Sequence, residues 1–129
     1  MTIEIHAAVD PGRARSNNED AVATDAAAKL AVLADGMGGY NAGEVASSMV
    51  TTFVGTELGR WLREASGQAS DAEVRRAMDI CVDNANRAIF NAANANPQYA
   101  GMGTTLVVIV FRGTRVLIGH VGDSRAYRL

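Results

Sequence analysis

Four acidic residues lie in loops or at the ends of predicted strands, where carboxylates are free to do chemistry. Glu19 and Asp20 occur together in RSNNEDA, Asp35 follows the apolar run LAVLA, and Asp123 lies in VGDSRAY. Hard divalent cations such as Mg²⁺ and Mn²⁺ take oxygen ligands from carboxylates, backbone carbonyls and water. The pattern therefore favours a metal site, and the alternative is that these acids only form turns.

Asp35 is the most informative of these residues. The apolar run before it predicts a buried strand, and the glycine-rich DGMGG segment after it predicts a turn. Gly36 lacks a Cβ and can therefore direct its carbonyl toward an ion that the neighbouring carboxylate holds. Asp-Gly is also among the strongest turn signals. On this stretch alone, a functional carboxylate and a turn residue are both consistent with the sequence.

Composition limits the classes of function. The chain has 129 residues, 48% of them hydrophobic, which predicts one globular domain. Its formal charge of -2 gives no reason to expect binding to nucleic acid or to an acidic membrane surface. No apolar stretch is long enough to span a bilayer, and no leader pattern opens the sequence, so we expect a cytoplasmic protein. Cys81 is the single cysteine, and we expect it to pack on the buried face of a helix.

The hydrophobic pattern predicts strands, then two helices, then strands. Three short β-rich segments cover residues 2–10, 21–25 and 30–35, and an apolar stripe at helical spacing runs from Gly43 to Leu62. Ser70 and Glu73 form a capping-box pattern that begins a second helix, and Pro97 lies beyond its end. Two further strands follow with a turn near residues 112–113, and a third begins near residue 123. This order predicts an α+β domain in which a helical pair covers one face of a sheet.

Other catalytic patterns are missing from the sequence. GMGG is not followed by the lysine and hydroxyl residue of a phosphate-binding P-loop, and no G-x-G-x-x-G opens a helix. The sequence also lacks a G-x-S-x-G nucleophile elbow and a cysteine–histidine pairing. Metal-assisted chemistry therefore remains the leading enzymatic hypothesis.

Four motifs together resemble a known family. RSNNED at 15–20, ADGMGG at 34–39, GMGTTL at 101–106 and VGDSRAY at 121–127 are similar, in order and spacing, to the N-terminal motifs of the metal-dependent protein phosphatases of the 2C (PPM) family. The DGMGG form resembles that of bacterial members. The resemblance implies a partial α-β-β-α sandwich of antiparallel sheets, with an antiparallel helical pair on one face and a centre of two Mn²⁺ or Mg²⁺ ions at one end between the sheets.

The resemblance also implies roles for individual residues. Asp35 matches the aspartate that bridges the two ions, and Gly36 matches the adjacent carbonyl ligand. Glu19 matches a position that can bind the second ion, and Asp20 matches an aspartate that acts directly or through water. Which of these two is the direct ligand stays open at this point.

Two further residues have counterparts in the family motifs. Asp123 resembles the aspartate of a third, weaker metal site, and Arg15 resembles an arginine that binds the substrate phosphate. A guanidinium group suits bidentate contact with phosphate oxygens. Met37 and Tyr40 replace histidines that are common in relatives, so the group that protonates the leaving group is not identified.

The implied activity is hydrolysis of phosphoserine and phosphothreonine in proteins by a hydroxide that bridges two metal ions. The implied partners are phosphorylated proteins and serine/threonine kinases, with no nucleic acid and no membrane. The alternative is an inactive, pseudophosphatase-like module that binds phosphoproteins or other partners. The sequence ends at Leu129, before the later S-D-G and D-N motifs of the family. We therefore expect residues 1–129 to be the N-terminal part of a single phosphatase domain whose C-terminal part is absent, with little activity in isolation.

Overall fold

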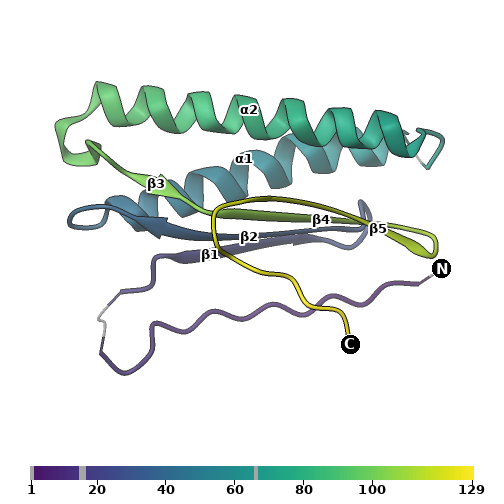
Figure 1. Cartoon of the computed structure of the whole chain (residues 1–129), viewed down its shortest axis with the longest axis horizontal. Helices are drawn as coiled ribbons and strands as arrows, with labels where there is room; N and C mark the ends of the chain where they lie inside the picture. The colour runs from purple at the N-terminus through teal and green to yellow at the C-terminus, as the bar shows by residue number, and fades with distance from the viewer. Residues whose placement is uncertain (1, 15–16, 66) are drawn as a thin grey trace.

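A computed structural model of the chain describes residues 2–14, 17–65 and 67–129. Two helices lie on one side of an antiparallel sheet (Figure 1). This arrangement confirms the predicted α+β class and the antiparallel helical pair on one face. The elements in chain order are β1 Asp20–Asp25, β2 Leu30–Met37, α1 Ala42–Ala65, α2 Asp71–Ala95, the short 3₁₀ helix η1 Pro97–Tyr99, β3 Gly103–Thr104, β4 Leu106–Arg112 and β5 Arg115–Val121.

The sheet has the strand order β1-β2-β4-β5, and the short β3 pairs with the end of β2. All pairings are antiparallel. Two of them come from tight hairpins, and the turn between β4 and β5 places Gly113 at a φ of 60°, which glycine adopts without strain. The chain passes between β2 and β4 through both helices, so residues far apart in sequence meet at the end of β2.

The two helices begin and end where the sequence predicts. Ser70 caps α2, with its hydroxyl accepting from the Glu73 N–H at 3.1 Å, and the capping box is complete. Arg112 on β4 contacts the residues on either side of Ser70. Its guanidinium donates to the Asp71 carboxylate at 2.8 Å and to the Ala69 carbonyl. The β4–β5 hairpin is thereby attached to the start of α2. No helix in the described ranges is long and apolar enough to cross a membrane.

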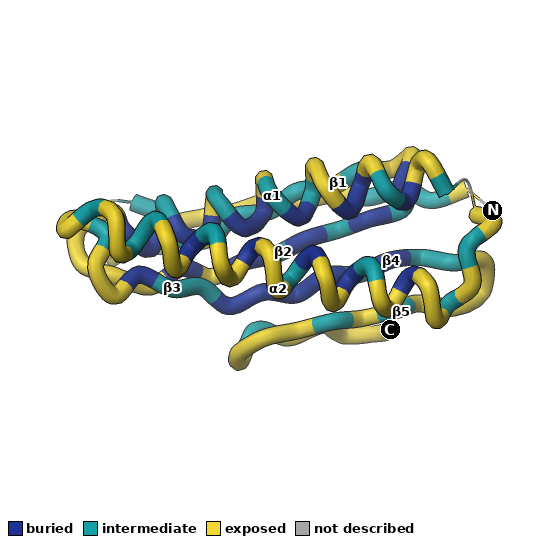
Figure 2. Tube along the Cα trace, turned by 90° about the horizontal axis from the view of Figure 1, so that it is seen from above, coloured by how far each residue is buried: buried dark blue, intermediate teal, exposed yellow. Residues whose placement is uncertain are grey.

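The core lies between the helices and the sheet, as the buried residues along the inner strands and helix faces show (Figure 2). Burial alternates along β2, where Leu30, Val32 and Ala34 face α1. Cys81 packs in the same core, which confirms its predicted role. Burial raises the pKa of the Cys81 thiol to about 11. The thiol is therefore protonated near neutral pH and is a poor nucleophile.

Two predicted strands do not form among the described residues. Residues 2–10 and 122–129 are extended but belong to no strand. Both segments run along the face of the sheet opposite the helices (Figure 1). There they line a cavity of about 290 Å³ together with residues of β1, β2 and β4. Their alternating sequence suits a strand, but a strand also needs a hydrogen-bonded neighbour, and neither segment has one in this structure.

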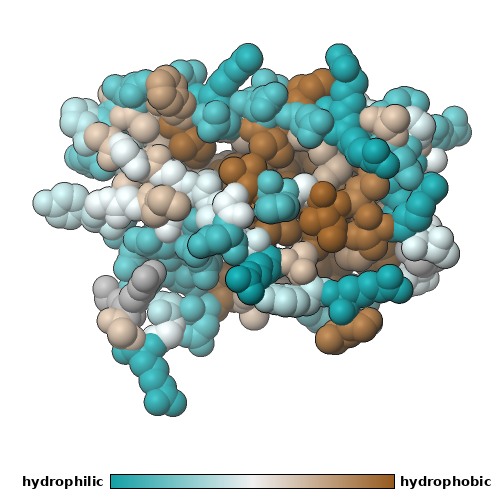
Figure 3. Space-filling model, viewed as in Figure 1, coloured by the Kyte–Doolittle hydropathy of each residue, from teal (hydrophilic) through white to brown (hydrophobic). Residues whose placement is uncertain are grey.

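The sheet keeps apolar side chains at its surface. Figure 3 shows hydrophobic side chains gathered over β4 and β5, and on β5 the exposed ones include Val116, Ile118 and Val121. A strand at the edge of a sheet with exposed apolar residues is a surface prone to further pairing. In the described part of the chain, the helices thus cover one face of the sheet, and only two extended segments run along the other face.

The end of β2 and the start of α1 touch through their backbones. A Cβ on Gly36 would lie 1.8 Å from the Gly43 carbonyl oxygen, and a Cβ on Gly43 would lie 2.9 Å from the Gly36 carbonyl carbon. Both glycines are buried. Only glycine at these positions allows the strand and the first turn of the helix to approach so closely.

We predict that Gly36→Ala destabilises the fold by ~2 kcal/mol or more, because the added methyl group collides with backbone that cannot rotate away. Gly39→Ala is the matched control, since a Cβ there meets nothing within 4 Å. Urea unfolding of the two variants beside the wild type measures the difference. Equal stability of Gly36→Ala and Gly39→Ala would show that this contact does not constrain the fold.

Candidate functional site

Asp20 and Asp35 lie directly opposite each other at the end of the β1–β2 pair. The Gly36 N–H donates to the Glu19 carbonyl at 2.9 Å, which makes Asp20 and Asp35 a pair without mutual backbone hydrogen bonds. In such pairs the side chains are closest, with Cβ atoms about 4.5–5.5 Å apart. Both residues are exposed, and the alternation along β2 places them on the face away from the helices.

Two carboxylates in this arrangement repel each other, because like charges directly opposite on a sheet are unfavourable. A divalent cation between or beside them would turn that repulsion into attraction. Carboxylate oxygens are also the donors that Mg²⁺ and Mn²⁺ prefer. The pair therefore fits a hard cation in both charge and donor chemistry.

Glu19 lies on the other side of β1 from this pair. Its carboxylate is against the start of α1, because a Cβ on Gly43 would lie 2.9 Å from Glu19 Oε2. A carboxylate near a helix N-terminus interacts favourably with the helix dipole. Asp20, in contrast, shares its face of the sheet with Asp35. The structure thus separates two neighbouring acids that the sequence could not distinguish.

The loop between β2 and α1 has two residues with positive φ. Gly38 and Tyr40 have φ values of 156° and 53°, and the Ala42 N–H donates to the Gly39 carbonyl at 3.0 Å as α1 begins. Met37 and Tyr40 are both exposed, at 55% and 97%. Tyr40 is almost fully in solvent, whereas Met37 pairs with Gly103 of β3.

Asp123 follows β5 and is exposed, but its neighbour Ser124 connects it to the end of β2. Ser124 Oγ lies 2.6 Å from Thr105 Oγ1. Thr105 in turn exchanges hydrogen bonds with Asp35: its N–H donates to the Asp35 carbonyl at 2.9 Å, and its hydroxyl accepts from the Asp35 N–H at 3.0 Å. Thr105 and Ser124 were not singled out by the sequence analysis, although both lie within the GTT and GDS motifs.

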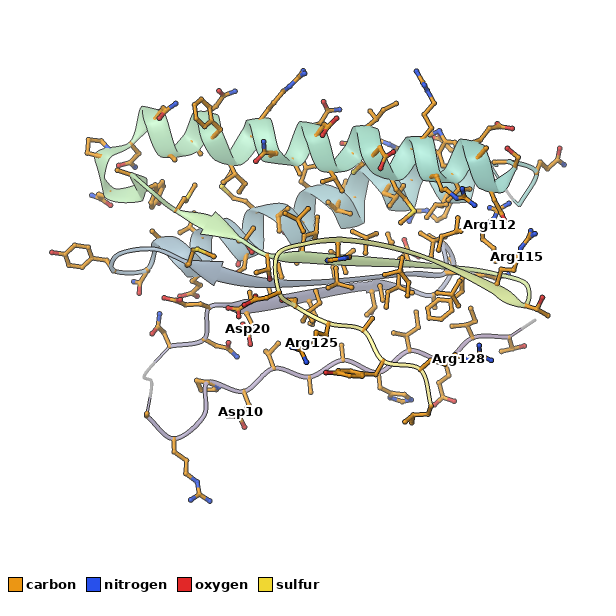
Figure 4. All side chains as sticks on the ribbon, viewed as in Figure 1. Asp10, Asp20, Arg112, Arg115, Arg125 and Arg128 are labelled. Carbon is orange, nitrogen blue, oxygen red and sulfur yellow. The ribbon has the colours of Figure 1, made fainter. Side chains whose placement is uncertain are left out.

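The segment after Ser124 continues below the same face of the sheet. Figure 4 shows Asp20 at the start of β1 and Arg125 on the C-terminal segment. Arg125 lines the cavity against Val22 and Leu33, which share the outer face with Asp20 and Asp35. This face therefore has acidic groups at its end and Arg125 farther along it.

The predicted site residues are only partly brought together. Asp20, Asp35 and Gly36 share the end of the β1–β2 pair, with Glu19 on the opposite side of the strand. Across residues 2–14, 17–65 and 67–129, no three histidine, cysteine or acidic side chains converge as a metal-binding group. Arg15 lies outside the described residues. The described residues thus bring two opposed carboxylates together, and a cation site at this position would need further donors.

Comparison with known proteins gives the same family for most of the chain. The family model described as protein phosphatase 2C matches residues 12–128. The serine/threonine protein phosphatase PstP of Mycobacterium tuberculosis is 39% identical over 129 residues, which are 100% of this chain and 23% of that protein. The serine/threonine phosphatase stp of Listeria monocytogenes is 33% identical over 123 residues, which are 93% of this chain and 47% of that protein.

Solved structures agree in fold. The crystal structure of the M. tuberculosis phosphatase PstP/Ppp superposes with a TM-score of 0.76 at 40% identity, over 90% of this chain and 45% of that one. The catalytic domain of PstP in complex with two manganese ions gives a TM-score of 0.73 at 39% identity, over 90% and 46%. The chain spans less than half the length of each of these relatives. With the family model matched from residue 12 to residue 128, the chain belongs to the protein phosphatase 2C family.

Proposed function

We propose that this chain supplies one side of the metal centre of a protein serine/threonine phosphatase, as the N-terminal part of a single catalytic domain. The observation that carries the proposal is the pair of opposed carboxylates, Asp20 and Asp35, at the end of the uncovered face of the sheet. A family relative of the same fold holds two manganese ions in its catalytic domain. We propose Mn²⁺ or Mg²⁺ as the cofactor here, bound at two sites and a third, weaker one.

Each acidic residue has a distinct place in this proposal. Asp35 would hold both ions, and the adjacent Gly36 carbonyl would be a further ligand. Asp20 lies on the same face of the sheet as Asp35 and would act on the ions from that face, directly or through water. The Glu19 carboxylate lies against the start of α1, on the opposite side of the strand. Asp123 belongs to the third site and is held near Asp35 through Ser124 and Thr105.

The reaction is hydrolysis of phosphoserine or phosphothreonine. When bound, the ions supply an acidified water and neutralise negative charge on the phosphate. The residues of this chain would position the positive charges. The carboxylates would hold the cations at the end of the β1–β2 pair, and Arg15 would bind phosphate oxygens of the substrate. We propose phosphorylated proteins as substrates, and serine/threonine kinases as the enzymes that make them.

A non-enzymatic binding module is the second candidate. An inactive relative could use Arg15 to bind a phosphoprotein and would have no need for a paired carboxylate site. The relatives with the highest identities given above are named as phosphatases, and the acidic residues of the family motifs are retained in this chain. Both observations favour the enzyme.

We predict that Asp35→Asn lowers Mn²⁺ affinity at least about tenfold, because it removes the charge that both ions would share. Isothermal titration with Mn²⁺ measures this on residues 1–129. In an assayed protein that carries the complete domain, hydrolysis of a phosphothreonine peptide should fall close to background. Asp83→Asn, an exposed substitution on α2, is the control and should leave both quantities unchanged. Unaltered Mn²⁺ affinity in Asp35→Asn would refute the assigned role.

Arg15→Ala should have a different signature, which is a raised KM for the phosphopeptide with Mn²⁺ affinity almost unchanged. The guanidinium contacts substrate in this proposal and does not contact the ions. Arg13→Ala removes the same charge two residues earlier and is the matched control. Steady-state kinetics with a phosphothreonine peptide separate KM from kcat. A parallel loss of Mn²⁺ affinity in Arg15→Ala, or an equal effect of Arg13→Ala, would contradict the assignment.

A further inference from the structure

The ladder between β2 and the β3–β4 segment is interrupted between the pairs Leu33–Val107 and Gly36–Thr104. Gly36 pairs with Thr104 and Leu33 pairs with Val107, so the register is continuous and places Asp35 opposite Thr105. In a regular antiparallel ladder these two residues would exchange two backbone hydrogen bonds. Only one of them is present, from the Thr105 N–H to the Asp35 carbonyl at 2.9 Å.

A side chain replaces the missing backbone bond. The Asp35 N–H donates to Thr105 Oγ1 at 3.0 Å instead of to the Thr105 carbonyl. That carbonyl accepts instead from the Thr104 hydroxyl at 2.8 Å. The Thr105 hydroxyl is thereby held in the plane of the sheet, against the backbone of Asp35. A local break in a ladder is a common way to re-aim a side chain beside an active site.

The same hydroxyl reaches the turn after β5. Thr105 Oγ1 lies 2.6 Å from Ser124 Oγ. The methyl group of Thr105 packs against the turn as well, because a Cβ on Gly122 would lie 2.8 Å from Thr105 Cγ2. Thr105 is only 5% exposed, whereas Asp123, between these two contacts, is exposed. A single buried threonine thus connects the backbone of Asp35 to both neighbours of Asp123.

We propose that Thr105 is a positioning residue that sets the placement of Asp123 relative to Asp35 through its hydroxyl group. The proposal rests on the proposed function for the metal-binding roles of the two aspartates. Thr105 itself contacts no reacting group in this assignment. It acts on the site because it fixes the backbone of one aspartate and the turn that carries the other.

The test compares Thr105→Val, which removes the hydroxyl and keeps the shape, with Thr105→Ser, which keeps the hydroxyl. Amide hydrogen exchange at Asp35 and the backbone resonances of Asp123 are followed by NMR in the 129-residue chain. We expect exchange at Asp35 to be about tenfold faster in Thr105→Val, with shifted Asp123 signals, and both to return close to wild type in Thr105→Ser. Thr24→Val, an exposed substitution on β1 opposite Ala31, is the control and should change neither.

A second variant keeps the test informative if Thr105→Val fails to fold. Ser124→Ala removes only the partner of the hydroxyl at a half-buried position. We expect it to shift the Asp123 signals while the Asp35 amide stays protected, because the bond from Asp35 to Thr105 is intact. Unchanged Asp123 signals in Ser124→Ala would overturn the proposal. So would a Thr105→Ser variant that behaves like Thr105→Val, since the retained hydroxyl would then fail to preserve the placement of the two aspartates.

Mn²⁺ titration of the same variants separates this inference from the proposed function. Groups that orient a metal ligand typically affect metal affinity by about 10- to 100-fold, so we expect Thr105→Val to weaken Mn²⁺ binding by about tenfold and Thr105→Ser to restore it. A wild-type chain that binds no Mn²⁺ would refute the proposed metal site. The exchange and resonance data would still decide whether Thr105 connects Asp35 with Asp123.

Discussion

The backbone contact between Gly36 and Gly43 is the constraint on which the candidate site depends. It brings the end of β2 against the first turn of α1, and no side chain larger than hydrogen fits between them. The Glu19 carboxylate fills the remaining space beside Gly43, while the Gly36 N–H holds the Glu19 carbonyl. The positions of Glu19, Asp20 and Asp35 are therefore consequences of one close approach between a strand and a helix.

The carboxylates of Asp20 and Asp35 are tolerated because they lie on the exposed outer face of the sheet. The inner face of β2 is buried under α1, but Asp20 and Asp35 project from the outer face near its end. Water, or a cation, can reach them there. The apolar residues of the outer face, among them Val22 and Leu33, continue from the acidic pair along the same strands and line the cavity beneath the terminal segments. The acidic pair thus marks the rim of an apolar surface, where a metal centre can be partly shielded from solvent.

Much of the fold follows from local sequence signals. Both helices and the strands of the two hairpins are marked by apolar periodicity. The Ser70–Glu73 capping box marks the start of α2, and Gly113 marks the β4–β5 turn. The segments 2–10 and 122–129 have equally good strand patterns, yet they form no strand. Alternation encodes which face a residue prefers, but pairing depends on a neighbouring strand, which is not a local property of the sequence.

For the candidate site, too, the local sequence specifies some features and not others. The acidic residues and Gly36 were predicted from residue type and from the family motifs, since carboxylates beside glycine-rich turns are visible in a sequence. The opposite orientations of Glu19 and Asp20 depend on strand register. The link from Asp35 through Thr105 to Ser124 depends on two contacts, which span 70 and 19 positions of the sequence. A threonine hydroxyl that replaces a backbone carbonyl in a ladder has no signature in the local sequence. It nevertheless connects Asp35 with the turn that carries Asp123, and the proposed metal centre requires both aspartates.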